Sequence, residues 1–84
     1  MSLDGCDAIL RQVCQVRGVD PIRLIQAERA TCAQLLVKGE AIYRMRLAGA
    51  SWPVIARVMF YRHHSQAMHA WKAFTATLTV GAKP

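Results

Sequence analysis

The second half of this 84-residue chain contains no acidic residue. All five acids lie within the first 40 residues, where five basic residues balance them, and they are Asp4, Asp7, Asp20, Glu28 and Glu40. Residues 41 to 84 therefore carry the whole formal charge of +6. A one-sided positive field of this kind attracts polyanions, of which nucleic acid is the commonest in a cell. The alternative is a solvated basic face that serves no partner.

The chain also lacks the cysteine spacing of metal sites and disulfide frameworks. It has three cysteines, an odd number, at Cys6, Cys14 and Cys32, and no Cys-X-X-Cys or Cys/His pair has zinc-ligand spacing. All three lie among apolar neighbours, and the three histidines cluster far away in the sequence. This pattern predicts buried, reduced thiols and no metal or other cofactor.

Long hydrophobic runs are absent as well. No segment reaches the roughly 20 apolar residues needed to span a bilayer, and the N-terminal MSLDGCDAIL has no basic stretch followed by an apolar one, as a secretory signal would. Together with the basic charge, these absences predict a cytoplasmic, nucleoid-associated protein that makes no membrane contact.

The short chain leaves little room for an enzyme cleft. A single domain over residues 1–84 buries only about 60% of its unfolded surface, so its core must be one compact cluster. Ser65 beside His64 could suggest a nucleophile and its base, but adjacent helical side chains diverge by about 100°. No acid in the second half of the chain could orient the imidazole. We therefore expect a binding module without enzymatic activity.

The first two of five predicted helices lie in the first third of the chain. One is expected over residues 4–17, with Asp4 as its N-cap and Gly18 at its end. Pro21 opens a short second helix, because proline is well suited to the first helical position. A loop is expected to follow near residues 27–31.

A third, long helix is predicted from its cap at Thr31 through Ala48. Apolar spacing predicts that its inward face consists of Leu35, Leu36, Ile42, Tyr43 and Leu47. Its charged side chains are expected to lie mostly away from that face, namely Lys38, Glu40, Arg44 and Arg46. Gly39 costs about 1 kcal/mol relative to alanine inside a helix, so it marks either a close helix crossing or a tolerated defect.

The last two helices complete an all-α fold. Ser51 is predicted to cap a helix of near eight residues whose core positions are Ile55, Val58 and Met59. The fifth helix is expected to begin around Arg62 or His63 and to run into the mid-70s, which leaves a frayed tail over residues 76–84. Its inward positions are predicted to be Ala67, Met68, Trp71, Phe74 and Leu78.

Residues 49–71, GASWPVIARVMFYRHHSQAMHAW, have the pattern of a helix-turn-helix. A tight connection would join the two helices, and the first turn of the second carries several hydrogen-bonding side chains next to an apolar seam. Trp52 is expected to pack the start of the first of these helices against the core.

From about residue 16 to 70, the chain resembles the C-terminal DNA-binding domain of DnaA-type replication initiators, a Trp-repressor-like helix-turn-helix domain. Ser51, Pro53 and Ile55 correspond to the family's S-L-P-E-I-G segment. Its signature G-R-D-H-T-T-V-L-H-A is matched by Arg62, His64, Ser65, His69 and Ala70. Leu24 and Ile25 fall on its paired leucines.

The chain departs from that family in two places. The family's basic loop, which reaches into the minor groove, corresponds to residues 26–34, QAERATCAQ, and keeps only Arg29 as a minor-groove candidate. His63 replaces the acid before the signature histidine, and Tyr61 replaces a glycine of the turn. Because an acid can accept a hydrogen bond from cytosine N4, we do not expect the family's usual selectivity.

The resemblance and the charge together predict a set of DNA contacts. The candidates for base contacts are His63, His64, Ser65 and Gln66, since the N-terminal residues of a recognition helix enter the major groove. The candidates for backbone contacts are Arg44, Arg46, Ser51, Pro53, Arg57, Arg62 and Lys72. The alternatives are helix capping or a surface role for the histidines and a solvated face for the cations, and His69 is expected to be structural.

The sequence thus predicts a protein that binds double-stranded DNA and regulates replication or transcription. The alternative is a protein-interaction module, a helix-turn-helix remnant that docks on a replication or transcription protein. A homodimer would suit either function, because pairing raises the affinity of a small recognition surface.

Overall fold

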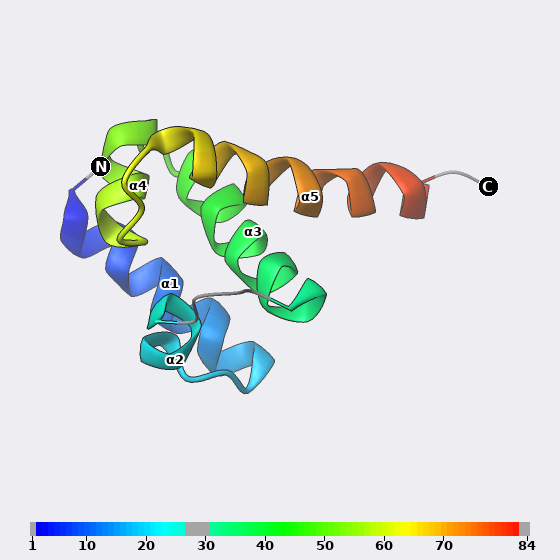
Figure 1. Ribbon diagram of the computed structural model, residues 1–84, viewed down its shortest axis with the longest axis horizontal. Helices are drawn as coiled ribbons and strands as arrows, with labels where there is room; N and C mark the ends of the chain where they lie inside the picture. The colour runs from blue at the N-terminus through cyan, green and yellow to red at the C-terminus, as the bar shows by residue number, and fades with distance from the viewer. Residues whose placement is uncertain (1, 27–30, 83–84) are drawn as a thin grey trace.

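The computed structural model describes residues 2–26 and 31–82, the last four of these by their backbone alone. The described residues form five helices and no strand, which confirms the all-α prediction. The helices are α1 (Leu3–Arg17), α2 (Pro21–Gln26), α3 (Cys32–Leu47), α4 (Trp52–Val58) and α5 (His64–Ala82). Figure 1 shows α5 running past α3 and extending beyond the other helices at its C-terminal end.

Local capping signals account for most of the helix boundaries. Gly18 ends α1 in the left-handed conformation, with φ 69°, as predicted. Thr31 and Gln34 form a reciprocal capping box at the start of α3, with each backbone N–H bonded by the other residue's side chain. The predicted cap of α1 is wrong, because Ser2 rather than Asp4 accepts a hydrogen bond, from the backbone N–H of Gly5 at 3.3 Å.

The core forms where α1, α3, α4 and α5 meet. Its largest fully buried side chains are Leu10, Leu24, Ile42, Met45, Ile55, Cys6 and Cys14. Burial raises the pKa of both the Cys6 and the Cys14 thiol, as expected for reduced core cysteines. Cys32 departs from the prediction, since it is exposed at the start of α3.

The inward face of α3 differs from the predicted one. The buried stripe includes Lys38, Ile42 and Met45, whereas Leu47 is 71% exposed. Glu40 is also buried. The prediction failed because α3 packs against α1 on one side and α5 on another, so more than one stripe of this helix is covered.

Gly39 marks a close helix crossing, which was one of its two predicted meanings. A Cβ atom added at Gly39 would lie 2.6 Å from the Cβ atom of Phe74 and nearer still to the carbonyl oxygen of Ala70. Only a residue without a side chain allows α3 and α5 to approach this closely. The crossing therefore fixes the position of α5 on the rest of the domain.

The fifth helix is longer than predicted, since it continues to Ala82 instead of ending in the mid-70s. The hydroxyl of Thr75 donates to the carbonyl oxygen of Trp71 at 3.0 Å, and that of Thr77 donates to Phe74 at 2.6 Å. Both hydroxyls are thus satisfied by carbonyl groups of the preceding turn, and the helix continues past them. Leu78, predicted to face the core, is 46% exposed.

Candidate functional site

The connection between α4 and α5 is a tight turn with an unusual residue at its centre. The backbone N–H of Phe60 donates to the carbonyl oxygen of Arg57 at 3.2 Å, and that of Tyr61 donates to Ala56 at 2.8 Å. This pair of bonds ends α4, and it requires a left-handed backbone conformation at position 60. Phe60 takes that conformation, with φ 58°, at a position where glycine is usual. The resemblance to the DnaA-type family places Tyr61 at a glycine of the turn, but the residue with a glycine-like backbone is Phe60.

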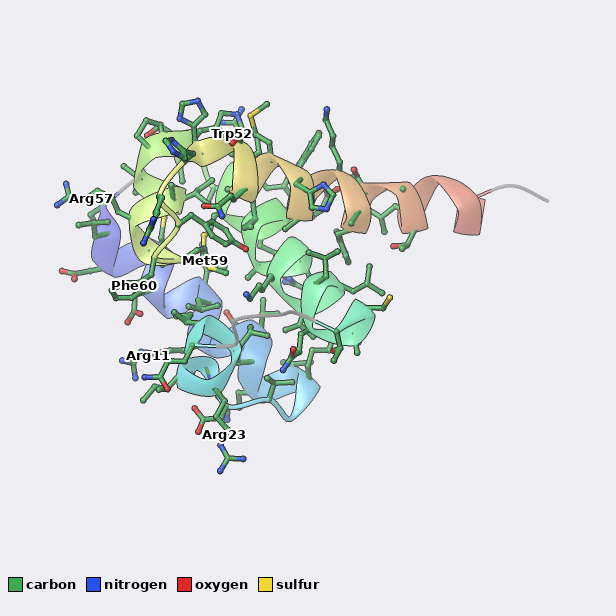
Figure 2. The ribbon with its side chains drawn as sticks, in the orientation of Figure 1. Arg11, Arg23, Trp52, Arg57, Met59 and Phe60 are labelled. Carbon is green, nitrogen blue, oxygen red and sulfur yellow. The ribbon has the colours of Figure 1, made fainter. Side chains whose placement is uncertain are left out.

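Phe60 is also the most exposed large apolar side chain among the described residues, at 77%. Figure 2 shows it at the left of the molecule, below Arg57 and above Arg11. Because the Phe60 ring is exposed, packing within the domain does not offset the cost of its left-handed backbone. A sequence signal existed, since an aromatic pair, Phe60 and Tyr61, stands where a turn was predicted.

The first turn of α5 presents its polar side chains to solvent. His63, His64 and Ser65 are all exposed, and their side chains form no hydrogen bond or ion pair within the described residues. Gln66 is exposed too, but its Oε1 accepts hydrogen bonds from the backbone N–H groups of Arg62 and His63, at 3.1 and 3.4 Å. Gln66 therefore caps α5, and its oxygen is engaged. The spacing of Gln66 three residues after His63 is the sequence signal for this cap.

The candidates for backbone contacts fall into two groups. Arg57, Arg62 and Lys72 are exposed and have no ion pair within the described part of the chain, and Figure 2 shows Arg57 directed away from the domain. Ser51 caps α4 by position without a side-chain hydrogen bond, and Pro53 follows in the first turn; both are exposed. These residues remain accessible to an external partner.

Two arginines of α3 are engaged within the domain. Arg46 donates from Nη1 to the carbonyl oxygen of Ala50 at 3.0 Å and stacks 4.7 Å from the centre of the Trp52 ring. Trp52 in turn meets Trp71 edge-on at 6.0 Å, in keeping with its predicted packing role. Arg44 pairs with Glu40 at 3.4 Å, so its charge is balanced by an acid from the first half of the chain.

The buried carboxylate of Glu40 pairs with two arginines at once. Its Oε1 accepts from Nε of Arg17 at 2.8 Å across the α1–α3 contact, and its Oε2 accepts from Nη2 of Arg44 at 3.4 Å. A buried carboxylate is tolerated when it is paired and hydrogen-bonded. The ion pair to α1 could not be predicted from spacing, because 23 residues separate its partners.

A cavity of about 530 Å³ lies beside this turn, between α2, α3 and the start of α5. Its polar lining residues are Lys38, Arg62, Ser65, Gln66 and His69, and none of its described lining residues is acidic. His69 was expected to be structural, but it is exposed and borders this cavity. The sequence does not identify Lys38 as a site residue, because its position on α3 is predicted to face solvent.

The remaining predicted site residue is Arg29, which lies outside the described residues. Within the described ranges, no group of three or more histidine, cysteine, aspartate or glutamate side chains could hold a metal ion. None of the helices described is long and apolar enough to cross a membrane. Comparisons with protein-family models, with curated proteins and with solved structures found no match to this chain.

Proposed function

We propose that this protein binds double-stranded DNA through a helix-turn-helix made of α4, the turn over residues 59–63 and α5, and that it regulates replication or transcription. The observation that carries the proposal is the exposed first turn of α5. His63, His64 and Ser65 are unpaired there, next to the free cations Arg57 and Arg62. Histidine and serine side chains can contact base edges, whereas arginine suits phosphate.

The charge distribution supports the same proposal. Arg44 is paired with Glu40, and Arg46 is held against Ala50 and Trp52. Three of the exposed cations without such contacts in the described residues, Arg57, Arg62 and Lys72, lie on α4, the turn and the first half of α5. Backbone contacts would then come from Ser51, Pro53, Arg57, Arg62 and Lys72. A helix N-terminus adds unpaired N–H groups that favour phosphate oxygens. The resemblance to the DnaA-type domain points to the same two helices.

Fluorescence anisotropy with labelled duplexes tests this proposal. Arg62→Ala should weaken binding to all sequences and reduce the slope of log affinity against log salt by about 1, since one phosphate contact is lost. His64→Ala should weaken binding to a preferred duplex while leaving the salt slope nearly unchanged. Arg23→Ala, which removes an exposed charge on α2, outside the proposed set of DNA contacts, is the control and should bind like the wild type.

Binding that is undetectable, or independent of salt, would contradict the proposal. A selection from a random duplex library, followed by sequencing, would identify the preferred bases. His63 stands where the DnaA-type family has an acid, so the selected sequence is expected to differ from that family's box.

A protein-interaction module is the second candidate function, and one observation favours it. Phe60 and Ile22 are 77% and 64% exposed, and both line a small apolar hollow together with Ile25. Exposed apolar side chains that gather in this way are typical of protein contacts. A pull-down with and without nuclease separates the two functions, because an association bridged by DNA disappears on digestion and a direct one persists.

A further inference from the structure

The cavity beside the turn has the size and lining of a ligand site. Its volume of about 530 Å³ lies within the range of roughly 300–1,000 Å³ that is usual for small-molecule pockets. Leu35 and Met59 provide apolar surface, and Tyr61 adds an aromatic ring. About half of its lining is polar, a larger share than small-molecule pockets usually have, and this favours a charged ligand over an apolar one.

Lys38 is the most informative of the polar groups. Its side chain is buried, with 6% of the residue exposed, and it forms no hydrogen bond or ion pair within the described part of the chain. Its nearest favourable contact is the Tyr61 ring, whose centre lies 5.8 Å from Nζ. Burial therefore lowers the pKa of Lys38. A buried ammonium without a hydrogen bond or ion pair is costly, and the contact with the Tyr61 ring offsets only part of that cost.

The ammonium of Lys38 is nevertheless accessible from the cavity. Lys38 lines the cavity, and 6% of the residue remains exposed. The amine is thus placed to meet a ligand that enters there.

Further donors border the same space. Arg62 supplies a guanidinium group, Ser65 a hydroxyl and His69 an imidazole, and among the described residues no acid lines the cavity. The positive charges of Lys38 and Arg62 match a dianion better than a single carboxylate. A phosphate monoester carries a charge of about −1.5 to −2 at pH 7 and offers three strong acceptor oxygens.

We propose that this cavity binds a small organic phosphate, with the phosphate group held by Lys38 and Arg62 and the apolar body lying against Leu35 and Tyr61. The inference does not depend on DNA binding, because it concerns a separate ligand in the isolated protein. If the chain does bind DNA, occupancy of the cavity should weaken that binding, since Arg62 and Ser65 belong to both surfaces.

Titration of the full, isotope-labelled chain with phenyl phosphate tests the proposal by two-dimensional NMR. We expect saturable shifts of the backbone signals of Tyr61 and Ser65, and weaker binding of inorganic phosphate at the same residues. Benzyl alcohol, a neutral molecule of similar shape, should leave these signals nearly unchanged. Lys38→Met should weaken phenyl phosphate binding at least about tenfold, as the loss of one charge-assisted contact implies. The matched control, Arg23→Met, removes a charge that does not line the cavity and should bind within twofold of the wild type.

Three results would overturn the proposal: no saturable shift with phenyl phosphate, equal affinity in Lys38→Met and Arg23→Met, or equal binding of benzyl alcohol. Arg62→Gln provides a second variant that should also weaken binding, so the test does not depend on how Lys38→Met folds. A short DNA duplex forms the final arm. If the duplex shifts these signals while phenyl phosphate does not, the cavity receives a phosphate of DNA, and the small-ligand proposal is wrong.

Discussion

Replacement of Gly39 by alanine tests how closely α3 and α5 approach each other. The new Cβ atom would lie 2.6 Å from the Cβ atom of Phe74 and nearer still to the carbonyl oxygen of Ala70. Neither neighbour can rotate away, because one is a backbone atom and the other is bonded directly to the backbone. The two helices must therefore separate by a fraction of an ångström or more.

Two opposing effects set the size of the change in stability. Alanine is favoured over glycine inside a helix by about 1 kcal/mol. Forcing an extra carbon into a packed contact typically costs about 1–3 kcal/mol, and occasionally more. Since fixed atoms surround Gly39 on the α5 side, we expect the overpacking cost to lie at or above that upper limit. The net loss should be about 2 kcal/mol, which lowers Tm by about 8–16 °C in a domain of this size.

Urea and thermal unfolding followed by circular dichroism provide the measurement. Ala33→Gly, the reverse exchange at an exposed position of the same helix, is the matched control and should lose about 1 kcal/mol from helix propensity alone. If Gly39→Ala proved as stable as the wild type while Ala33→Gly lost stability, helix propensity would outweigh the contact with α5. The close crossing would then be refuted.

Three further substitutions address the turn, the buried acid and the buried amine. Phe60→Gly should raise the free energy of unfolding by about 1 kcal/mol, because it removes the cost of a left-handed phenylalanine, and an unchanged or lower value in urea would refute the strain. Glu40→Gln should lower it by about 1–2 kcal/mol, because both arginine partners lose an anion while remaining partly in water; a loss within error would show that the pairs contribute nothing. Lys38→Met should raise it by about 1–3 kcal/mol at pH values below the folded pKa of Lys38, where the buried amine is charged. The folded pKa of Lys38 lies below 10.5, so the unfolded chain binds this proton more tightly. The free energy of unfolding of the wild type therefore increases as the pH rises through the folded pKa toward 10.5. The advantage of Lys38→Met should therefore shrink over that alkaline window, and an advantage that grows there would contradict the assignment.

The polar residues of the candidate site could be predicted in part. His63, His64 and Ser65 lie within a single helical turn, so their proximity follows from helix geometry as soon as a helix is expected there. Their exposure follows as well, because the apolar positions of the fifth helix begin only at Ala67, which is buried. The position of Gln66 three residues after His63 is enough to predict its capping role, although its hydrogen-bonding groups favour a prediction of base contacts.

The other half of the site could not be predicted in this way. Lys38 lies on α3, Ile25 on α2 and His69 on α5, and they meet at one cavity only because α3 packs under the turn. No periodicity within α3 indicates that a lysine should be covered. Its burial depends on how Tyr61, 23 positions further along the chain, lies across it.

The sequence by itself determined the number of helices, the approximate ends of all but the last, and the uneven distribution of charge. Caps such as Thr31 and Gly18 act through hydrogen bonds and backbone angles within a few residues, so short-range patterns contain the necessary information. The tertiary structure alone decided which stripes of α3 are covered and which arginines remain free. Those outcomes depend on contacts between residues distant in the sequence, as in the pair of Arg17 and Glu40, and packing fixes them only once all the helices are in place.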